Sequence, residues 1–272
     1  MFPRGNILDF AANSIPPAIL AEIERRLASV ARENGVRLLL AVESGSRAWG
    51  FPSPDSDYDV RFLYVRPRRA YLALRPLRDV VERPITDEID LSGWDIRKAL
   101  GLLLKHNAVL SEWLQSPVRY IADDPVAGRL ATLADRHFDP RGYARHYASL
   151  GRGALDRWFG QDGDVPVKRY FYALRPALMV RALRLDPAHR PPMNIVPLMK
   201  AAKLEPEIAS QIGELIARKA RTNEAGNTMR LPALDRLIAN ELGRADEVPG
   251  RTHATGFEGE ADALFMELME EA

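Results

Sequence analysis

The sequence predicts an α+β fold: a mixed, twisted sheet with flanking helices, followed by an all-helical region. Short runs of β-branched, aromatic and other apolar residues, which are typical of strands, occur between helical patterns up to about residue 121. Beyond about residue 125, apolar residues recur at helical spacing in one segment after another. A mixed pattern followed by helices alone indicates two compact units, and we expect them at residues 1–125 and 126–272.

The first unit is expected to begin with an amphipathic helix over residues 15–30, in which Ile19, Ile23 and Leu27 share one face. Asn34-Gly35 is a typical helix end. The nearly continuous apolar run at 36–42 predicts a strand that is covered on both faces. The remaining predicted elements are strands at 60–65, 80–82, 88–91 and 118–121 and helices at 96–105 and 108–114.

The second unit is expected to consist of helices separated by Gly, Pro and Asn breaks. The predicted helices span 125–136, 141–158, 167–185, 206–221 and 231–242. A further acidic segment from residue 257 onward carries Leu264, Phe265 and Leu268 at helical spacing. We expect this terminal segment to be a helix that packs on the body of the protein.

The composition is that of an ordinary soluble protein, with 46% hydrophobic and 28% charged residues among 272. The absence of cysteine excludes disulfides, thiolate zinc sites and thiol nucleophiles, and is compatible with a reducing cytoplasm. No apolar run approaches the ~18 residues that a membrane span needs, and no signal core follows the N-terminus, so we expect a cytoplasmic location. A net charge of +1 gives the whole chain no general attraction to nucleic acid, although five arginines and no acid occur at 66–78.

A phosphate-binding turn is predicted after the strand at 36–42. Gly45-Ser46 lies where a strand turns into a helix start, and a glycine there lets backbone N–H groups approach a phosphate closely. The Ser46 hydroxyl can add a hydrogen bond, and Arg47 or Arg61 a charged one.

A pair of carboxylates is predicted at the start of the next strand. Asp57 and Asp59 are two positions apart, so their side chains project from one face, with Cα atoms about 6.5–7 Å apart. Carboxylates at this spacing can hold hard cations such as Mg²⁺ or Mn²⁺. The phosphate oxygens of a nucleoside triphosphate such as ATP would complete the coordination of these cations. Tyr58 between them is expected to point into the core.

Two carboxylates make a poor two-metal clamp, so a third is expected on a neighbouring strand. Asp90 has the right setting, because Ile89 and Leu91 flank it with apolar side chains. Asp95 is the rival, but its place before a helix favours an N-cap. Two further contenders are Asp87 and Glu88.

In the second unit, Lys168, Tyr172 and Arg175 fall on one face of a predicted helix. Such a face could hold triphosphate oxygens and stack a base, or it could be a salt-bridged face with Tyr172 in an interface. Three residues of the first unit are further candidates for nucleotide contacts: Lys105, Asn107 and Glu112. The five histidines show no metal-ligand spacing, and Trp49 in the turn favours packing over base stacking.

The Gly-Ser turn, the Asp-x-Asp pair and the later apolar-Asp-apolar strand together resemble the DNA polymerase β-like nucleotidyltransferase superfamily. Three longer phrases resemble its RlaP-type branch, predicted nucleotidyltransferases associated with RNA repair: GSRAWGFPSPDSDYDVRFLYV, GWDIRKALGLLLKHNAVLSEWLQSPVRY and KRYFYALRPALMVRAL. The similarity covers about residues 15–200. It implies a nucleotidyltransferase fold in the first unit, a triphosphate turn at Gly45 and Ser46, and metal ligation by Asp57, Asp59 and Asp90.

The function expected from these features is metal-dependent transfer of a nucleoside monophosphate from a triphosphate to a hydroxyl, with release of pyrophosphate. The acceptor could be an RNA end, such as a tRNA or a broken RNA, with the arginines at 66–78 and the helix of Lys168 forming its channel. The alternatives are a protein hydroxyl, a small molecule such as an aminoglycoside, and a nucleotide-binding regulatory module that lacks turnover.

Overall fold

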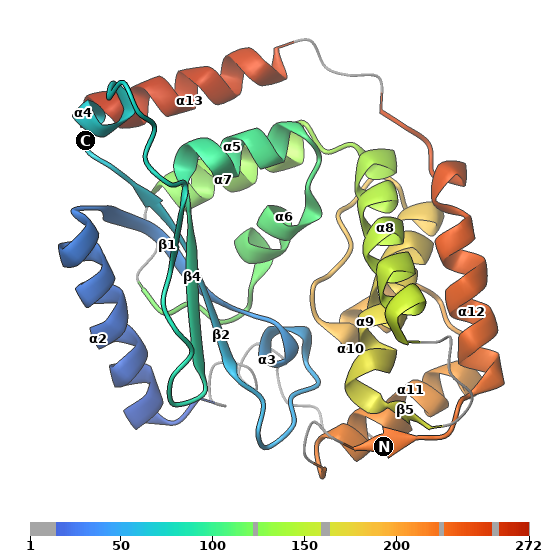
Figure 1. Ribbon diagram of the computed structural model, residues 1–272. Coiled ribbons are helices and arrows are strands. Elements are labelled where there is room, and N and C mark those ends of the chain that lie inside the picture. Colours follow the sequence, from blue (N-terminus) through green and yellow to red (C-terminus); the bar gives the residue numbers. More distant parts are fainter. Residues whose placement is uncertain (1–14, 122–124, 159–163, 223–225, 252–255, 272) are drawn as a thin grey trace.

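A computed structural model describes residues 15–121, 125–158, 164–222, 226–251 and 256–271 of the chain. Its centre is a four-stranded mixed sheet of order β1-β2-β4-β3, formed by β1 (Arg37–Ser44), β2 (Tyr58–Val65), β4 (Ile89–Asp95) and β3 (Val80–Glu82). β1 and β2 are antiparallel, β2 and β4 are parallel, and β4 and β3 are antiparallel. The predicted mixed sheet is therefore confirmed (Figure 1).

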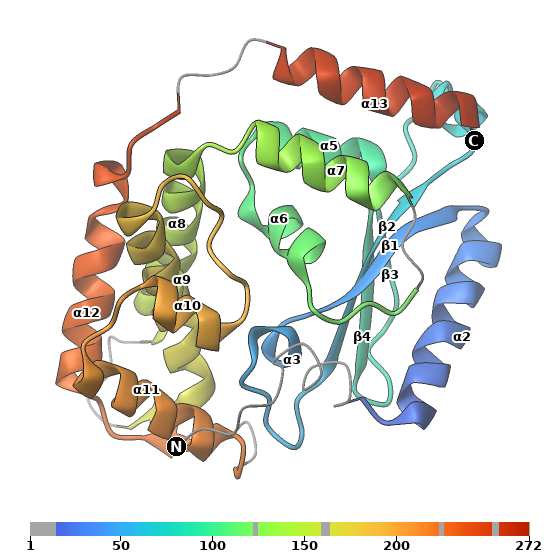
Figure 2. The ribbon, with the colours of Figure 1, turned by 180° about the vertical axis from the view of Figure 1, so that it is seen from behind.

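Alternation along the strands gives the sheet two apolar faces. Val60 and Phe62 of β2 pack with the helix α2 (Pro17–Asn34), which ends at Gly35 in the left-handed conformation as predicted. Leu63 and Val65 face the opposite side. That side is covered by α5 (Ile96–Leu104), α6 (Ala108–Gln115) and α7 (Pro125–Arg136), so the helices lie in layers on both faces of the sheet (Figures 1 and 2).

Most of the residues expected in the second unit form a helical bundle beside the sheet. Its core contains α8 (Pro140–Trp158), α9 (Val167–Leu185) and α12 (Pro232–Gly243). Around them lie α10 (Ile195–Ala201), α11 (Pro206–Lys219), the 3₁₀ turn η1 (Ala245–Glu247) and the two-stranded pair of β5 (Val165–Pro166) with β6 (Asn227–Thr228). The bounds of α7 and α9 are those predicted from sequence.

The terminal helix α13 (Phe257–Glu271) returns to the sheet unit. Its Leu264, Leu268 and Met269 belong to the apolar cluster of α5 and α7, which confirms that the acidic segment is a packed helix. α7, at the expected start of the second unit, packs in the same cluster. The expected division at 125 directly follows residues 122–124, which lie outside the described residues. Within the described part of the chain, no helix combines the length and the apolarity that crossing a bilayer requires.

The structure differs from the sequence-based elements in a few places. The predicted strand at 118–121 is only an isolated bridge of Arg119 to Val42 on β1. β4 extends to Asp95, beyond the predicted end at 91. The short helices α3 (Ser46–Trp49), α4 (Arg68–Tyr71) and α10 were not delimited from sequence, because four to seven residues hold too few turns for a periodic pattern.

Candidate functional site

The aspartates of β2 and β4 lie side by side. In the parallel ladder, Asp59 is the register partner of Asp90, so their Cα atoms are separated by about one strand spacing of 4.8 Å. By the alternation of β2, the Asp59 side chain points to the same face as Leu63 and Val65, the face that α5, α6 and α7 cover. Both carboxylates are about a quarter exposed. Two aspartates that are 31 residues apart in sequence therefore meet on one accessible face.

Arg61 lies between these two carboxylates. It stands two residues after Asp59 on the same face of β2, and its Nη2 donates to Asp59 Oδ1 at 3.1 Å and to Asp90 Oδ2 at 2.6 Å. Its Nη1 donates to the backbone oxygens of Asp90 at 2.9 Å and of Val60 at 3.1 Å. One guanidinium nitrogen thus occupies the position that a cation shared by both carboxylates would take.

Gly45 places the predicted turn directly against Asp59. Its φ of 77° and ψ of −155° belong to a backbone region that is essentially limited to glycine. A Cβ atom added to Gly45 would lie 2.0 Å from Asp59 Oδ2. The Asp59 carboxylate therefore occupies the space that a side chain at position 45 would need, which is the reason for a glycine here.

Burial and neighbouring charges make Asp59 an unusual acid. Desolvation is the main cause that raises the pKa of Asp59 to about 6, and the negative charges of Asp90 and Asp57 raise it further. The positive charges of Arg61 and Lys168 act in the opposite direction. Asp57 and Lys168 are therefore close enough to Asp59 to share its electrostatic environment.

Glu43 is a fourth carboxylate that the sequence reasoning did not single out. It is fully buried on β1, its Oε1 accepts the backbone N–H of Asp59 at 3.0 Å, and its Oε2 accepts the Tyr120 hydroxyl. Burial is the main cause that raises the pKa of Glu43 to about 8. Glu43 thus fixes the backbone of Asp59. The available signal was an acid directly after the apolar run at 36–42.

The chemistry of this donor set fits a hard divalent cation. Asp59 and Asp90 present carboxylate oxygens toward one point, and Asp57 lies near them; oxygen ligands are those that Mg²⁺ prefers. Among the described residues, no group of three or more His, Asp or Glu side chains is already arranged around a metal position. Arg61 instead holds one oxygen of each aspartate. A cation would have to displace that guanidinium.

Arg47 has a different role from the expected phosphate contact. Its Nη2 donates to the backbone oxygen of Ser56 at 2.6 Å and its Nε to that of Asp57 at 3.3 Å, while the guanidinium stacks on the Tyr58 ring at 4.0 Å. These contacts hold the loop that ends at Asp57. Ser46, in contrast, is the partly exposed first residue of α3, and Tyr58 is buried as predicted.

The three residues predicted on one face of α9 differ in burial and in their partners. Lys168 is partly exposed near Asp59, and Tyr172 is 44% exposed and meets the Trp49 ring edge-on at 5.9 Å. Arg175 is instead buried, with Nη2 3.0 Å from Glu112 Oε2, and it stacks on Trp49 at 4.6 Å. The expected contact of Arg175 with a triphosphate is therefore replaced by an ion pair inside the interface of the two units.

Three of the remaining sequence candidates have structural partners. Asp95 caps α5 by accepting the N–H of Arg97 at 2.9 Å, as predicted, and it lies at the other end of β4 from Asp90. Asn107 caps α6 in the same way. Asp87 pairs with Arg26 at 2.6 Å.

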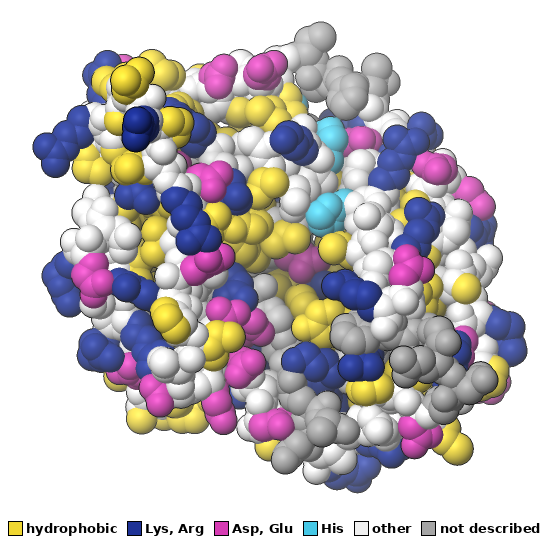
Figure 3. All heavy atoms as spheres, in the orientation of Figure 1, with side chains coloured by type: hydrophobic (Ala, Val, Ile, Leu, Met, Phe, Trp, Pro, Cys, Tyr) yellow, Lys and Arg dark blue, Asp and Glu magenta, His cyan; other side chains and the backbone are white. Residues whose placement is uncertain are grey.

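The arginines at 66–78 do not flank the aspartates. They follow the end of β2 at Val65, which is six residues, or about 20 Å along the strand, from Asp59. Figure 1 shows α4 and α3 at opposite ends of the sheet. Figure 3 shows Lys or Arg and hydrophobic side chains gathered over α4, at the upper left, whereas both charge signs are interspersed over the rest of that face.

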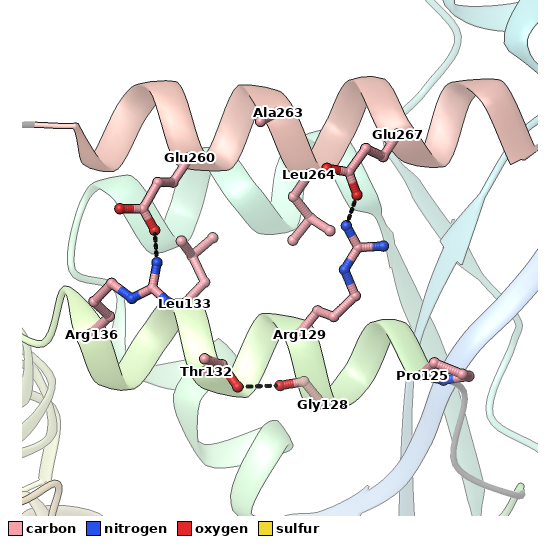
Figure 4. A pocket seen from close by; sticks show the side chains of 10 residues that line it. All are labelled: Pro125, Gly128, Arg129, Thr132, Leu133, Arg136, Glu260, Ala263, Leu264 and Glu267. Atoms are coloured by element: carbon pink, nitrogen blue, oxygen red, sulfur yellow. Dashed lines mark hydrogen bonds and ion pairs between the residues drawn. The ribbon is translucent and has the colours of Figure 1, made fainter.

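An open groove of about 550 Å³ lies between α7 and α13 and contains none of the candidate site residues. Ion pairs of Arg129 with Glu267 and of Arg136 with Glu260 cross it (Figure 4). These pairs and Leu264 hold the terminal helix on α7, so we assign the groove to helix packing.

Comparison with known proteins identifies the family of the chain. Residues 19–267 match the model of a family described as RlaP, the RNA repair pathway DNA polymerase beta family. The uncharacterized protein YcgL of Bacillus subtilis (strain 168) is 38% identical over 229 residues, which cover 84% of this chain and 86% of that protein. A nucleotidyltransferase-like protein from Exiguobacterium sibiricum 255-15, known from a crystal structure, is 12% identical in sequence. The match covers 92% of this chain and 80% of that chain, with a TM-score of 0.31. The protein therefore belongs to the RlaP family of the DNA polymerase β type and is a nucleotidyltransferase with an α+β fold.

Proposed function

We propose that the protein transfers a nucleoside monophosphate from a nucleoside triphosphate to a hydroxyl acceptor, with Mg²⁺ or Mn²⁺ and release of pyrophosphate. One observation carries the proposal: Asp59 and Asp90 are register partners on adjacent strands, on a partly exposed face, with the Gly45 backbone against Asp59. Carboxylates opposite a close-approach glycine turn are what a polyphosphate held by divalent cations needs.

The residues have distinct roles in this proposal. Asp57, Asp59 and Asp90 hold the cations, and Gly45 and Ser46 present the turn to the phosphates. The cations, when bound, orient the triphosphate and lower the pKa of the acceptor hydroxyl. Asp90 accepts the proton of that hydroxyl as its oxygen bonds to the α-phosphorus and the bond to pyrophosphate breaks.

Lys168 and Tyr172 complete the site from the helical bundle. The positive charge of Lys168 acts on Asp59, which supports a contact of Lys168 with the triphosphate. Tyr172 offers an exposed ring next to Trp49 for the base. Arg47 and Arg175 act on the protein itself, through the loop at Ser56 and through Glu112.

The test is a pyrophosphate-release assay with each nucleoside triphosphate, Mg²⁺ or Mn²⁺, and labelled RNA or protein fractions. Asp59→Asn and Asp90→Asn should each abolish release and leave the fold intact, because both side chains are partly exposed. Asp79→Asn is the matched control, since Asp79 is an exposed aspartate of the same unit that pairs only weakly with Lys98, at 3.4 Å. Full activity in either site variant would overturn the assignment.

For the acceptor we propose an RNA end, which the description of the family supports. Binding of RNA through phosphate contacts should weaken steeply as salt rises, whereas labelling of a protein or a small molecule should depend little on salt. Because the arginines at 66–78 lie at the far end of the sheet, their replacement should affect RNA binding more than pyrophosphate release. Nucleotide binding without any pyrophosphate release would favour the regulatory module instead.

A further inference from the structure

The segment from Gly45 to Asp57 belongs by sequence to the sheet unit, but its middle is embedded in the helical bundle. Phe51 is 2% exposed and is part of the apolar cluster of α8, α9 and α12. Its ring stacks on that of Phe171, with centroids 4.2 Å apart and planes inclined by 13°. The segment that carries the turn at one end and Asp57 at the other is thus anchored outside its own unit.

The bundle also holds the start of this segment. The Arg175 guanidinium lies over the Trp49 ring, and Asn194 Nδ2 donates to the backbone oxygen of Ala48 at 3.4 Å. Gly50 has a φ of 89°, and a Cβ atom there would lie 2.5 Å from Asn194. Asn194 also caps α10. The position of α3, which follows Gly45, is therefore set by α9 and α10.

The end of the segment is held by a buried lysine. Lys219, the last residue of α11, is 2% exposed, and its Nζ lies 3.3 Å from Ser53 Oγ and 3.5 Å from Ser56 Oγ. The two serines are themselves buried and bonded to each other: the Ser53 N–H donates to Ser56 Oγ at 2.9 Å and the Ser56 N–H to Ser53 O at 3.1 Å. A buried ammonium is costly to desolvate, which makes this contact unusual for a mere surface loop.

A direct chain of contacts leads from Lys219 to the aspartates. Ser56 precedes Asp57, and Arg47 binds the backbone oxygens of both residues, so a shift of Ser56 moves Asp57. Asp57 in turn contributes to the electrostatic environment of Asp59.

We propose that Lys219 is a positioning residue of the nucleotidyl-transfer site and that the helical bundle, through Lys219, sets the position of Asp57. This inference rests on the proposed function for its catalytic consequence, but not for its structural one. The bundle then serves the site by holding the loop as well as by supplying Lys168 and Tyr172. Loss of the ammonium should leave both units folded and release the loop.

The structural consequence can be measured by hydrogen exchange in the full-length protein. In Lys219→Met, the amides of Ser53 and Ser56 should exchange roughly tenfold faster or more, while the amides of β2 keep their wild-type rates. Lys200→Met, which alters an exposed lysine of the same bundle, should leave all these rates unchanged. Wild-type exchange at both serines in Lys219→Met would overturn the proposal.

The catalytic consequence is a changed metal requirement. A displaced Asp57 should raise the Mg²⁺ concentration for half-maximal pyrophosphate release roughly tenfold in Lys219→Met, which a purely structural loss of stability would not do. An unchanged Mg²⁺ requirement together with faster loop exchange would refute the positioning role. If the wild-type protein releases no pyrophosphate, the proposed function fails, and the exchange measurement still decides whether Lys219 holds the loop.

A second variant keeps the test decisive if Lys219→Met does not fold. Ser56→Ala retains the lysine but removes one of the two hydroxyls that link it to the loop. The Ser56 amide, whose acceptor Ser53 O stays in place, should show the same increase in exchange, and the Mg²⁺ requirement the same shift, to a smaller extent. Wild-type values for both quantities would contradict the inference.

Discussion

Replacement of Gly45 by alanine is the sharpest single test of the site geometry. The added Cβ would lie 2.0 Å from Asp59 Oδ2, whereas ordinary van der Waals contact begins at 3.4 Å, so the oxygen must retreat by about 1.4 Å. That movement strains the contact of Asp59 with Arg61, now 3.1 Å, because both groups lie on one strand. A displacement of an ångström at a reacting centre can cost about 100-fold in rate, so we expect a loss of that order in pyrophosphate release.

The cost in stability can be separated from the clash by a matched variant. Gly45 has a φ of 77° in a region that costs a non-glycine residue about 1–3 kcal/mol. Gly35 has a φ of 58° in the left-handed helical region, with no atom within 4 Å of an added Cβ, so Gly35→Ala should cost about 1–2 kcal/mol through backbone strain alone.

The two variants should therefore differ in activity far more than in stability. Denaturant unfolding gives the stability of each, and pyrophosphate release at a temperature where both are folded gives the rate. Gly35→Ala should retain the wild-type rate, and Gly45→Ala should lose about two orders of magnitude. Equal rates in the two variants would refute the close approach of the turn to Asp59 as the basis of the site.

Three further predictions follow from buried or shared charges. Because burial raises the pKa of Glu43 to about 8, the folded protein binds the Glu43 proton more tightly than the unfolded chain does. The protonated Glu43 therefore contributes to stability at low pH, and this contribution is lost as the pH rises through about 8. Glu43→Gln should flatten that loss, measured by unfolding at pH 5 and pH 9, and an unchanged pH profile would contradict it. Glu112→Gln should destabilise the fold by about 3 kcal/mol, because it leaves Arg175 buried without its counter-ion, whereas Asp246→Asn in an exposed pair should leave the stability nearly unchanged. Arg61→Gln should raise the affinity for Mn²⁺ severalfold in the absence of nucleotide, because the guanidinium no longer competes for Asp59 and Asp90. Metal titration measures this affinity. A lower affinity would show that Arg61 supports the bound cation and does not occupy its place.

The parts of the fold that depend on local signals were predictable from sequence. The helices at 125–136 and 167–185 occur with the predicted bounds, and Asp95 caps α5 as its position before a helix indicated. These features arise from side-chain periodicity and from hydrogen bonds between residues two to four positions apart, so neighbouring residues contain the whole signal. The strand predicted at 118–121 is only an isolated bridge, because strand pairing depends on a distant partner and a short apolar run does not show whether one is available.

The candidate site was predictable only in its composition. Gly45, Asp59 and Asp90 were singled out by residue type and setting, and the structure brings them together. The partners of these residues come from distant parts of the chain: Glu43 from β1 and Lys219 from the far end of α11. No pattern within a window of sequence records such contacts, and the same holds for the burial of Arg175 against Glu112.

By itself, the sequence determined which residues are candidates, because a glycine turn and acids flanked by apolar residues are typical of a phosphate contact and of oxygen ligands at strand ends. Only the tertiary structure decided which charges meet. Strand register paired Asp59 with Asp90, the two-residue alternation put Arg61 between them, and helix packing buried Lys219 against the loop. Register and packing are settled by the burial of whole faces, which depends on residues far apart in the chain, and for that reason these contacts appear only when the chain is folded.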